Sequence, residues 1–290
     1  MDFFSQAYRG KTEWWRYVTY IVTSIVVAAI VQVILLVPLM ILCNKNGIVM
    51  NPNELPFPIV MLCFAPFLFS FMLLAKPFLK RNAMSFITAR KSFSFRIFGW
   101  SALWFCVVLI LDFVIGYLCD TENHIFNYTG ADFWIFVIMA IILLPIQTGT
   151  EEFVVRGVLM QWLGVIFRNR IAAIVGSAVV FALLHFANEE VTDFGMPISM
   201  SIYLITGLSL GLIATVTDGI ESSWGMHYAN NLMAFTICSV EKRYNPLFVL
   251  DNVEVTWFSV VCSLIETVIV ILLIKRFVPF SFSRLFDPVT

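Results

Sequence analysis

Charge is scarce in this sequence: Asp, Glu, Lys and Arg together make up only 13% of its 290 residues. The net charge is −1, so no overall basic character indicates a nucleic-acid partner. The six cysteines are scattered, without a CxxC spacing or a Cys/His cluster, which argues against a cysteine-based zinc or redox motif. Repeats and low-complexity segments are also missing, so we expect one structural unit without a separate soluble domain.

Apolar residues fill the chain instead. They make up 60% of the sequence, and 29 residues are phenylalanine. A soluble globular protein does not need that much apolar surface, so we predict an all-α, polytopic membrane protein with about eight transmembrane helices. The apolar stretches that define these helices are Tyr17–Cys43, Pro58–Ala75, Ile97–Leu118, Phe133–Phe167, Ile171–Asn188, Ile198–Thr217, Ser223–Val240 and Trp257–Ile274.

Basic residues indicate the orientation. Lys76–Arg96 is the most basic segment, and short basic runs follow the stretches that end at Phe167 and Ile274. By the positive-inside rule these segments lie in the cytoplasm. We therefore expect an integral, multi-pass protein of a bacterial cell membrane with cytoplasmic N- and C-termini. The apolar residues between the basic ones make Lys76–Arg96 either an interfacial helix on anionic lipid or a solvated linker.

Three charged residues, Glu151, Glu152 and Arg156, lie in the middle of one apolar stretch. Charged groups at membrane depth are costly and usually face a cavity. Glu152 and Arg156 are four residues apart, so they share a helix face and are expected to form a supporting ion pair. Glu151 lies about 100° around the helix. It is the freer acid and suits a general base.

Two histidines and an asparagine follow at membrane depth. His185 ends one stretch, and His227 and Asn231 share a helix face in another. Alone, each is more simply an interfacial or interhelical hydrogen-bonding residue. With Glu151 they allow two chemistries: a carboxylate and an imidazole that activate water, with a second imidazole and an amide binding the oxyanion, or zinc bound by Glu151, His185 and His227. The residues alone do not separate these two.

Other hydrolase signatures give little. HExxH and a GxGD pair are missing, and we see no serine or cysteine in the surroundings of an activated nucleophile.

An ion-coupled transporter with Asp112 and Glu266 as relay groups is a further alternative. The lack of a two-fold repeat argues against it.

Three motifs occur in order: Glu-Glu-x-x-x-Arg (151, 152, 156), Phe-x-x-x-His (181, 185) and His-x-x-x-Asn (227, 231). Together they resemble the CPBP (Abi) family, which comprises type II CAAX prenyl endopeptidases and bacterial proteins named after bacteriocin processing and self-immunity. The resemblance covers residues 140 to 235. We accordingly divide the chain into N-terminal helices with the basic loop (1–132), catalytic core helices (133–240) and a last loop with the C-terminal helix (241–290).

The resemblance implies an intramembrane endopeptidase that acts on a membrane-associated peptide or protein. Glu151 would be the general base, His185 would help to activate water, and His227 and Asn231 would form the oxyanion hole. Glu152 and Arg156 would be structural supports, and no metal would be required. Expected partners are the peptide or protein substrate and membrane lipid, with no nucleic acid. The alternative is a non-catalytic immunity or scaffold protein that binds a peptide or a sensor.

One geometric conflict follows from simple alternating spans. His185 should lie near the outer end of its helix and His227 near the inner end of its own, so both could reach Glu151 only if helices are broken or re-entrant. We expect the irregularity at Pro145, at Gly149 or in the turn Asp218–Ser222.

Overall fold

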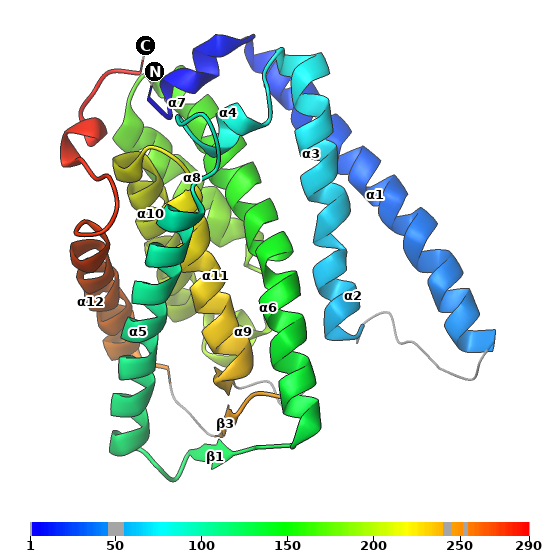
Figure 1. The fold of residues 1–290 in the computed structure, drawn as a ribbon, viewed down its shortest axis with the longest axis vertical. Helices are drawn as coiled ribbons and strands as arrows, with labels where there is room; N and C mark the ends of the chain where they lie inside the picture. The colour runs from blue at the N-terminus through cyan, green and yellow to red at the C-terminus, as the bar shows by residue number, and fades with distance from the viewer. Residues whose placement is uncertain (1, 46–54, 240–244, 252–254, 290) are drawn as a thin grey trace.

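The computed structural model describes residues 2–45, 55–239, 245–251 and 255–289. In this described part, eight helical passes form one bundle (Figure 1). They are α1 (Trp14–Lys45), α2 with α3 (Phe57–Leu62, Phe64–Leu79), α5 (Phe95–Cys119), α6 with η2 and α7 (Ala131–Glu152, Phe153–Met160, Gln161–Phe167), α8 (Arg170–Leu184), α10 (Met196–Thr217), α11 (Glu221–Thr236) and α12 (Trp257–Ile274). The predicted all-α polytopic fold is confirmed. Val240, the predicted end of the seventh stretch, lies outside the described residues.

Six of the described helical segments are long and apolar enough to cross a membrane. The protein is therefore an integral membrane protein. The other two passes differ in character: α8 is apolar but has only 15 residues, and α11 has 16 residues that include Glu221, His227 and two asparagines. Because α11 packs against α5, α6 and α10, protein rather than lipid surrounds its polar side chains.

Short elements connect the long helices. They are η1 (Ser5–Arg9), α4 (Met84–Ile87), α9 (Glu189–Asp193), η4 (Phe282–Leu285) and the strands β1 (His124–Phe126), β2 (Cys238–Ser239) and β3 (Phe248–Leu250). The strands form a small sheet in the order β1-β3-β2, antiparallel between β1 and β3 and parallel between β3 and β2. The sheet lies at the end of the bundle opposite the two termini (Figure 1).

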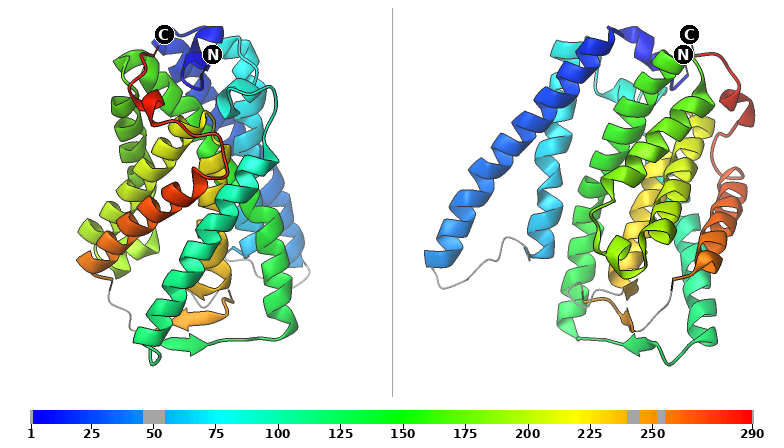
Figure 2. Two further views of the ribbon diagram at one scale, coloured as in Figure 1. Left: turned by 60° about the vertical axis from the view of Figure 1, so that its left-hand side comes forward. Right: turned by 180° about the vertical axis from the view of Figure 1, so that it is seen from behind.

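The two sides of the bundle are formed by different helices. α1 packs along α3, and α3 packs on α6; α12 lies on the opposite side of the molecule (Figure 2). The termini meet at one end, where the Tyr8 hydroxyl donates to the carbonyl oxygen of Val289 at 3.4 Å. This end also holds the starts of α5 and α8 and the end of α3 (Figures 1 and 2).

The basic segment Lys76–Arg96 between α3 and α5 packs partly against the protein. Neither predicted form, an interfacial helix on lipid or a solvated linker, describes its whole length. Its short helix α4 is buried at Ser85 and Phe86, and Arg81 is only 1% exposed. The Arg81 guanidinium donates to Gln161 on α7 at 2.6 Å and to the Tyr17 hydroxyl on α1 at 3.1 Å. The segment therefore folds onto the bundle and links the α1–α3 pair to the continuous helical pass formed by α6, η2 and α7.

Glycines allow the helices around the site to pack closely. A Cβ on Gly207 would lie 2.9 Å from the Cα of Ala178, so α10 touches the backbone of α8. Small residues at a helix interface allow such a close approach. A Cβ on Gly149 would lie 2.3 Å from the Trp224 ring, so α6 and α11 are equally close. These two contacts bring three helices of the predicted site together.

Candidate active site

Glu152 and Arg156 form the predicted ion pair, fully buried, with 2.8 Å between Oε1 and Nη1. The pair is also connected to two other helices. Arg156 donates to the carbonyl oxygen of Gly207 on α10 at 3.3 Å, and Glu152 Oε1 accepts from His227 Nδ1 on α11 at 2.9 Å. Breaking a buried pair leaves an uncompensated charge. Because Glu152 is held by Arg156 and also accepts from His227 Nδ1, the pair fixes the position of the His227 ring.

Glu151 faces the opposite way, toward both histidines. Its Oε2 lies 3.4 Å from His227 Nε2 and 3.9 Å from His185 Nε2. This oxygen is buried and has no hydrogen-bond partner among the described residues. The other oxygen, Oε1, accepts from the side chain of Gln147 one helical turn earlier. One carboxylate oxygen is therefore held, and the other points at two imidazole nitrogens.

His185 follows the last residue of α8 and is held in place from several directions. Its Nδ1 lies 2.8 Å from the carbonyl oxygen of Phe181. A carbonyl oxygen can only accept, so Nδ1 donates and Nε2 is left facing Glu151. The ring packs between Phe181 at 4.4 Å and Tyr203 on α10 at 4.5 Å. A water between Glu151 and His185 would meet an acceptor on each side.

Asn231 lies in the same site, where it contacts Gln147. Its Nδ2 donates to Gln147 Oε1 at 2.9 Å, and its Oδ1 accepts from Asn230 Nδ2 at 3.2 Å. The structure thus brings all six predicted residues together. It adds Gln147 and Tyr203, which the sequence reading missed, and Asn230, a polar residue at membrane depth to which that reading gave no role. A signal for Gln147 was available, because it is a polar residue in an apolar helix four positions before Glu151.

These groups open into a cavity of about 760 Å³. Its polar part is the site itself, and one part of its apolar wall comes from α1, α2 and α3. Residues of that wall include Ile21, Ile25, Met61, Phe64, Phe67 and Phe71. On the other side Glu266 and Thr267 of α12 reach the same cavity. The volume accommodates a peptide segment together with water.

The expected conflict in depth between His185 and His227 does not occur, and α8 supplies one reason. At 1.5 Å per residue its 15 residues span only about 22 Å, less than the ~30 Å of a bilayer core. His185 therefore lies well inside the molecule. The end of α8 and the short helix α9 lie closer to the middle of the bundle than the level at which α5 ends and α6 begins (Figure 2).

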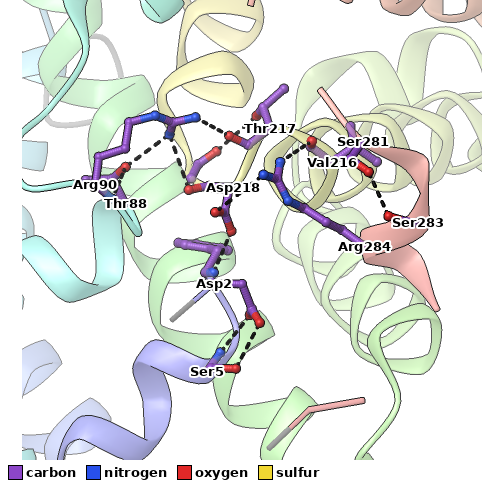
Figure 3. Close-up of polar contacts among 12 residues, drawn as sticks. Asp2, Ser5, Thr88, Arg90, Val216, Thr217, Asp218, Ser281, Ser283 and Arg284 are labelled. Carbon is purple, nitrogen blue, oxygen red and sulfur yellow. Dashed lines mark hydrogen bonds and ion pairs between the residues drawn. The ribbon is translucent and has the colours of Figure 1, made fainter. Parts of the chain in front are cut away.

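The recessed start of α11 supplies the other reason. The turn before it is covered by the Asp218 cluster, which consists of Phe3, Arg90, Asp218 and Arg284. Figure 3 labels Arg90, Asp218 and Arg284 of this cluster. Asp218 Oδ1 accepts from the Phe3 backbone N–H at 2.7 Å, and its Oδ2 lies 3.7 Å from Arg284 Nη2. Arg90 donates to the Thr217 carbonyl oxygen at 2.5 Å. Because three distant segments lie over this turn, α11 begins inside the bundle and carries His227 to the level of Glu151.

Of the three places where an irregularity was expected, only the turn at Asp218 interrupts the helices, and a further irregularity follows Glu152. α6 continues as one α-helix through Pro145 and Gly149 to Glu152, and the π-helix η2 follows over Phe153–Met160. π-Helical turns widen the hydrogen-bonding ring and occur often at functional sites. Here the π-helix begins directly after the two glutamates. It tightly contacts α4, since a Cβ on Gly157 would lie 2.6 Å from the Phe86 carbonyl oxygen.

Comparison with known proteins found similarity in the part of the chain that carries this site. Residues 130–233 match the family described as type II CAAX prenyl endopeptidase, Rce1-like. The uncharacterized protein YyaK of Bacillus subtilis (strain 168) is 27% identical over 171 residues. The matched segment is thus similar to the Rce1-like (CPBP) family. The alignment with YyaK covers 59% of this chain and 56% of the relative, so the chain matches little more than half of that protein. No solved structure matches the chain.

A serine near this site has the letters of a nucleophile motif without its structure. Gly207, Ser209 and Gly211 read as GxSxG, a pattern whose serine normally sits on a sharp strand-to-helix turn. Here all three lie inside the continuous helix α10. Ser209 donates to the Ile205 carbonyl oxygen at 2.7 Å and lies 3.0 Å from the Thr267 hydroxyl. Ser209 is therefore a helix-packing residue that lines the cavity.

The zinc arrangement considered for Glu151, His185 and His227 depends on which of their atoms are free to bind a metal ion. Within the described ranges, no group of three or more His, Cys, Asp or Glu side chains is arranged to hold a metal ion. His227 Nδ1 is already bonded to Glu152, and His185 Nδ1 to a carbonyl oxygen. The two remaining Nε2 atoms both face the same oxygen of Glu151.

Proposed function

We propose that the protein is an intramembrane endopeptidase that hydrolyses a peptide bond in a membrane-associated protein or peptide. The observation that carries this proposal is the buried, unpartnered Oε2 of Glu151 facing the Nε2 atoms of His185 and His227 at 3.9 and 3.4 Å. The family of the matched segment consists of membrane endopeptidases. A carboxylate and an imidazole in one cavity are the groups that water activation requires.

In the proposed reaction a water lies between Glu151 and His185. Glu151 takes a proton from it, His185 Nε2 accepts its second hydrogen bond, and the water oxygen bonds to the carbonyl carbon of the substrate. His227 and Asn231 donate to the oxygen that becomes negative. When the tetrahedral intermediate collapses, the carbon–nitrogen bond breaks and the proton held by Glu151 passes to the leaving amine. No step uses a metal ion.

Glu152 and Arg156 have the proposed role of structural supports. Both side chains are fully buried, so neither can contact substrate in the cavity. Glu152 instead accepts from His227 Nδ1, which turns His227 Nε2 toward the cavity. A donor from Nε2 then requires that the His227 ring carries a proton on each nitrogen.

We further propose that the end with the two termini faces the cytoplasm. Basic residues gather there, as the positive-inside rule requires. Those of this end include Arg9, Lys11, Arg16, Lys76, Lys80, Arg90, Lys91, Arg96, Arg168 and Arg170. The apolar wall of the cavity on the α1–α3 side would receive a membrane-associated substrate. Lipid and a peptide or protein substrate are thus the proposed partners.

The test is cleavage of a quenched-fluorescent, farnesylated CAAX-type peptide by protein in lipid vesicles. Glu151→Gln is expected to lower the rate at least about 10²-fold, and His185→Ala similarly. Glu266→Gln is the matched control, since Glu266 lines the same cavity on another helix, and it should keep the wild-type rate. Cleavage by Glu151→Gln at the wild-type rate would overturn the mechanism. Loss of activity after chelation, with recovery on adding zinc, would favour the metal arrangement.

A further inference from the structure

Within the described chain, Glu190 is a cavity carboxylate without a basic partner. It lies on the short helix α9, is half-buried and lines the same cavity as His185. Its Oε2 accepts from the Tyr203 hydroxyl at 3.4 Å. Its Oε1 has no hydrogen-bond or ion-pair partner among the residues that the structure describes. One carboxylate oxygen of Glu190 is therefore available to a ligand in the cavity.

Two other carboxylates of the bundle interior have the partner that Glu190 lacks. Glu221 of α11 is fully buried and lies 3.5 Å from Arg90. Glu266 lines the cavity on α12, and its carboxyl group bonds that of Asp112 on α5. The helix α9 that carries Glu190 lies closer to the middle of the bundle than the small sheet does (Figure 1). A charged group at such a depth is costly and usually faces a functional partner, which for Glu190 a substrate can supply.

The surroundings of Glu190 determine the charge of that partner. No lysine or arginine side chain lines the cavity in the described parts of the chain, so no basic group of the cavity competes for this carboxylate. A carboxylate between apolar walls attracts a cation and repels an anion. A basic side chain would form charge-assisted hydrogen bonds with Glu190, whereas an acidic one would place two like charges together. The expected ligand is therefore a lysine or arginine side chain.

Tyr203 sets the distance between Glu190 and the proposed catalytic residues. Its ring stacks on His185 with 4.5 Å between the ring centres, and its hydroxyl accepts from Asn188 Nδ2 at 3.0 Å. The hydroxyl hydrogen is then left for Glu190 Oε2, which orients the carboxylate. Glu190 thus lies within roughly 10 Å of His185, a distance that an extended peptide spans in about three residues. A basic side chain that reaches Glu190 therefore belongs to a residue close to the cleaved bond.

We propose that Glu190 is a specificity-determining residue that binds a lysine or arginine side chain of the substrate, within about three residues of the cleaved bond. The proposal rests on the proposed endopeptidase function, because it names the class of peptide that the same cavity selects. Glu190 takes no part in the bond cleavage itself. Its contribution is the difference in binding between a peptide with a basic residue at this position and one with a neutral or acidic residue there.

The test is a series of farnesylated CAAX-type peptides in which one position near the cleaved bond, other than the farnesylated cysteine, is lysine, glutamine or glutamate. At one of these positions the protein in lipid vesicles should cleave the lysine peptide with a kcat/KM about tenfold above that of the glutamine peptide, as expected for a hydrogen bond between charged groups. The glutamate peptide should be cleaved most slowly. Equal kcat/KM values for the three residues at every position would overturn the proposal.

Variants of Glu190 assign the preference to this side chain. Glu190→Gln should cleave the glutamine peptide at the wild-type rate, which shows that it is folded, and should no longer prefer the lysine peptide. Glu190→Lys should prefer the glutamate peptide instead. Glu266→Gln is the matched control, because Glu266 lines the same cavity from another helix, and it should keep the preference for lysine. A preference that survives in Glu190→Gln, or one that disappears in Glu266→Gln, would contradict the proposal.

A binding measurement separates this proposal from the proposed reaction. Fluorescence anisotropy gives the affinity of the Glu151→Gln variant for the labelled lysine and glutamine peptides. The lysine peptide should bind about tenfold more tightly, and adding Glu190→Gln should make the two affinities equal. If the peptides bind in this way but the wild-type protein cleaves none of them, the endopeptidase mechanism fails and the role of Glu190 stands. Cleavage and binding that do not depend on Glu190 would leave the endopeptidase and overturn the role of Glu190.

Discussion

Gly149 is the position where one methyl group should separate the catalytic residues. A Cβ there would lie 2.3 Å from Cζ2 and 2.7 Å from Cε2 of Trp224, whereas ordinary contact begins at 3.4 Å. The ring has little room to retreat, because Phe93 and Phe98 pack on it at 5.2 and 5.8 Å. Gly149→Ala must therefore push α11 away from α6 by about 1 Å in a close-packed interior.

That displacement acts directly on the site. The bond of 2.9 Å between His227 Nδ1 and Glu152 Oε1 would lengthen to about 4 Å, beyond hydrogen-bond range. A misplacement of this size costs about 10²-fold in rate, and the overpacking costs about 1–3 kcal/mol of stability. Peptide cleavage in vesicles and thermal unfolding measure the two effects. Gly99→Ala is the matched control, because a Cβ at Gly99 meets nothing within 4 Å.

A compensating change separates the steric explanation from other causes. Leucine in place of Trp224 makes room for the added methyl group. The double variant Gly149→Ala, Trp224→Leu should therefore be more active than expected from adding the free-energy losses of the two single variants. Residues in contact commonly show such a coupling. Wild-type activity in Gly149→Ala, or strictly additive losses in the double variant, would refute the reasoning.

Substitutions at Arg156 and Tyr203 test the supports of the site. Arg156→Met leaves the carboxylate of Glu152 buried without its cation, so the free energy of unfolding measured with denaturant should fall by about 3–5 kcal/mol. Arg16→Met is the control, because Arg16 belongs to a partly exposed pair, and its loss should be at most about 1 kcal/mol. Equal losses in the two variants would contradict the buried-charge argument. Tyr203→Phe keeps the ring that stacks on His185 at 4.5 Å and should keep the cleavage rate, whereas Tyr203→Leu should lower it about three- to tenfold. A loss in the phenylalanine variant instead would assign the effect to the hydroxyl group.

Much of the site could be predicted from the sequence because helix geometry relates spacing to direction. Four residues separate Glu152 from Arg156, and this alone placed them on one face and left Glu151 on another. The apolar stretches likewise located the helices, because an apolar run of this length can cross the bilayer as one helix. Both inferences depend only on local periodicity, which the sequence contains directly.

The rest depended on contacts between distant segments. The depth of His227 is set by Phe3, Arg90 and Arg284 around Asp218, which no local pattern relates to one another. Gln147 attracts little notice in an apolar helix, and its importance appears only when Asn231 is placed opposite it. The three-stranded sheet was missed because strands of two or three residues are too short to show a period of two.

The Asp218 cluster also has a consequence for the order in which the protein becomes active. Arg284 follows α12 in the chain, so it is synthesised after every helix that carries a site residue. Until it emerges, the turn before α11 lacks the contacts from Arg284 to Asp218 and to the Val216 carbonyl oxygen at 2.8 Å. The geometry of the proposed site is therefore completed last. A released chain that ends just beyond α12 should insert into the membrane but should cleave poorly.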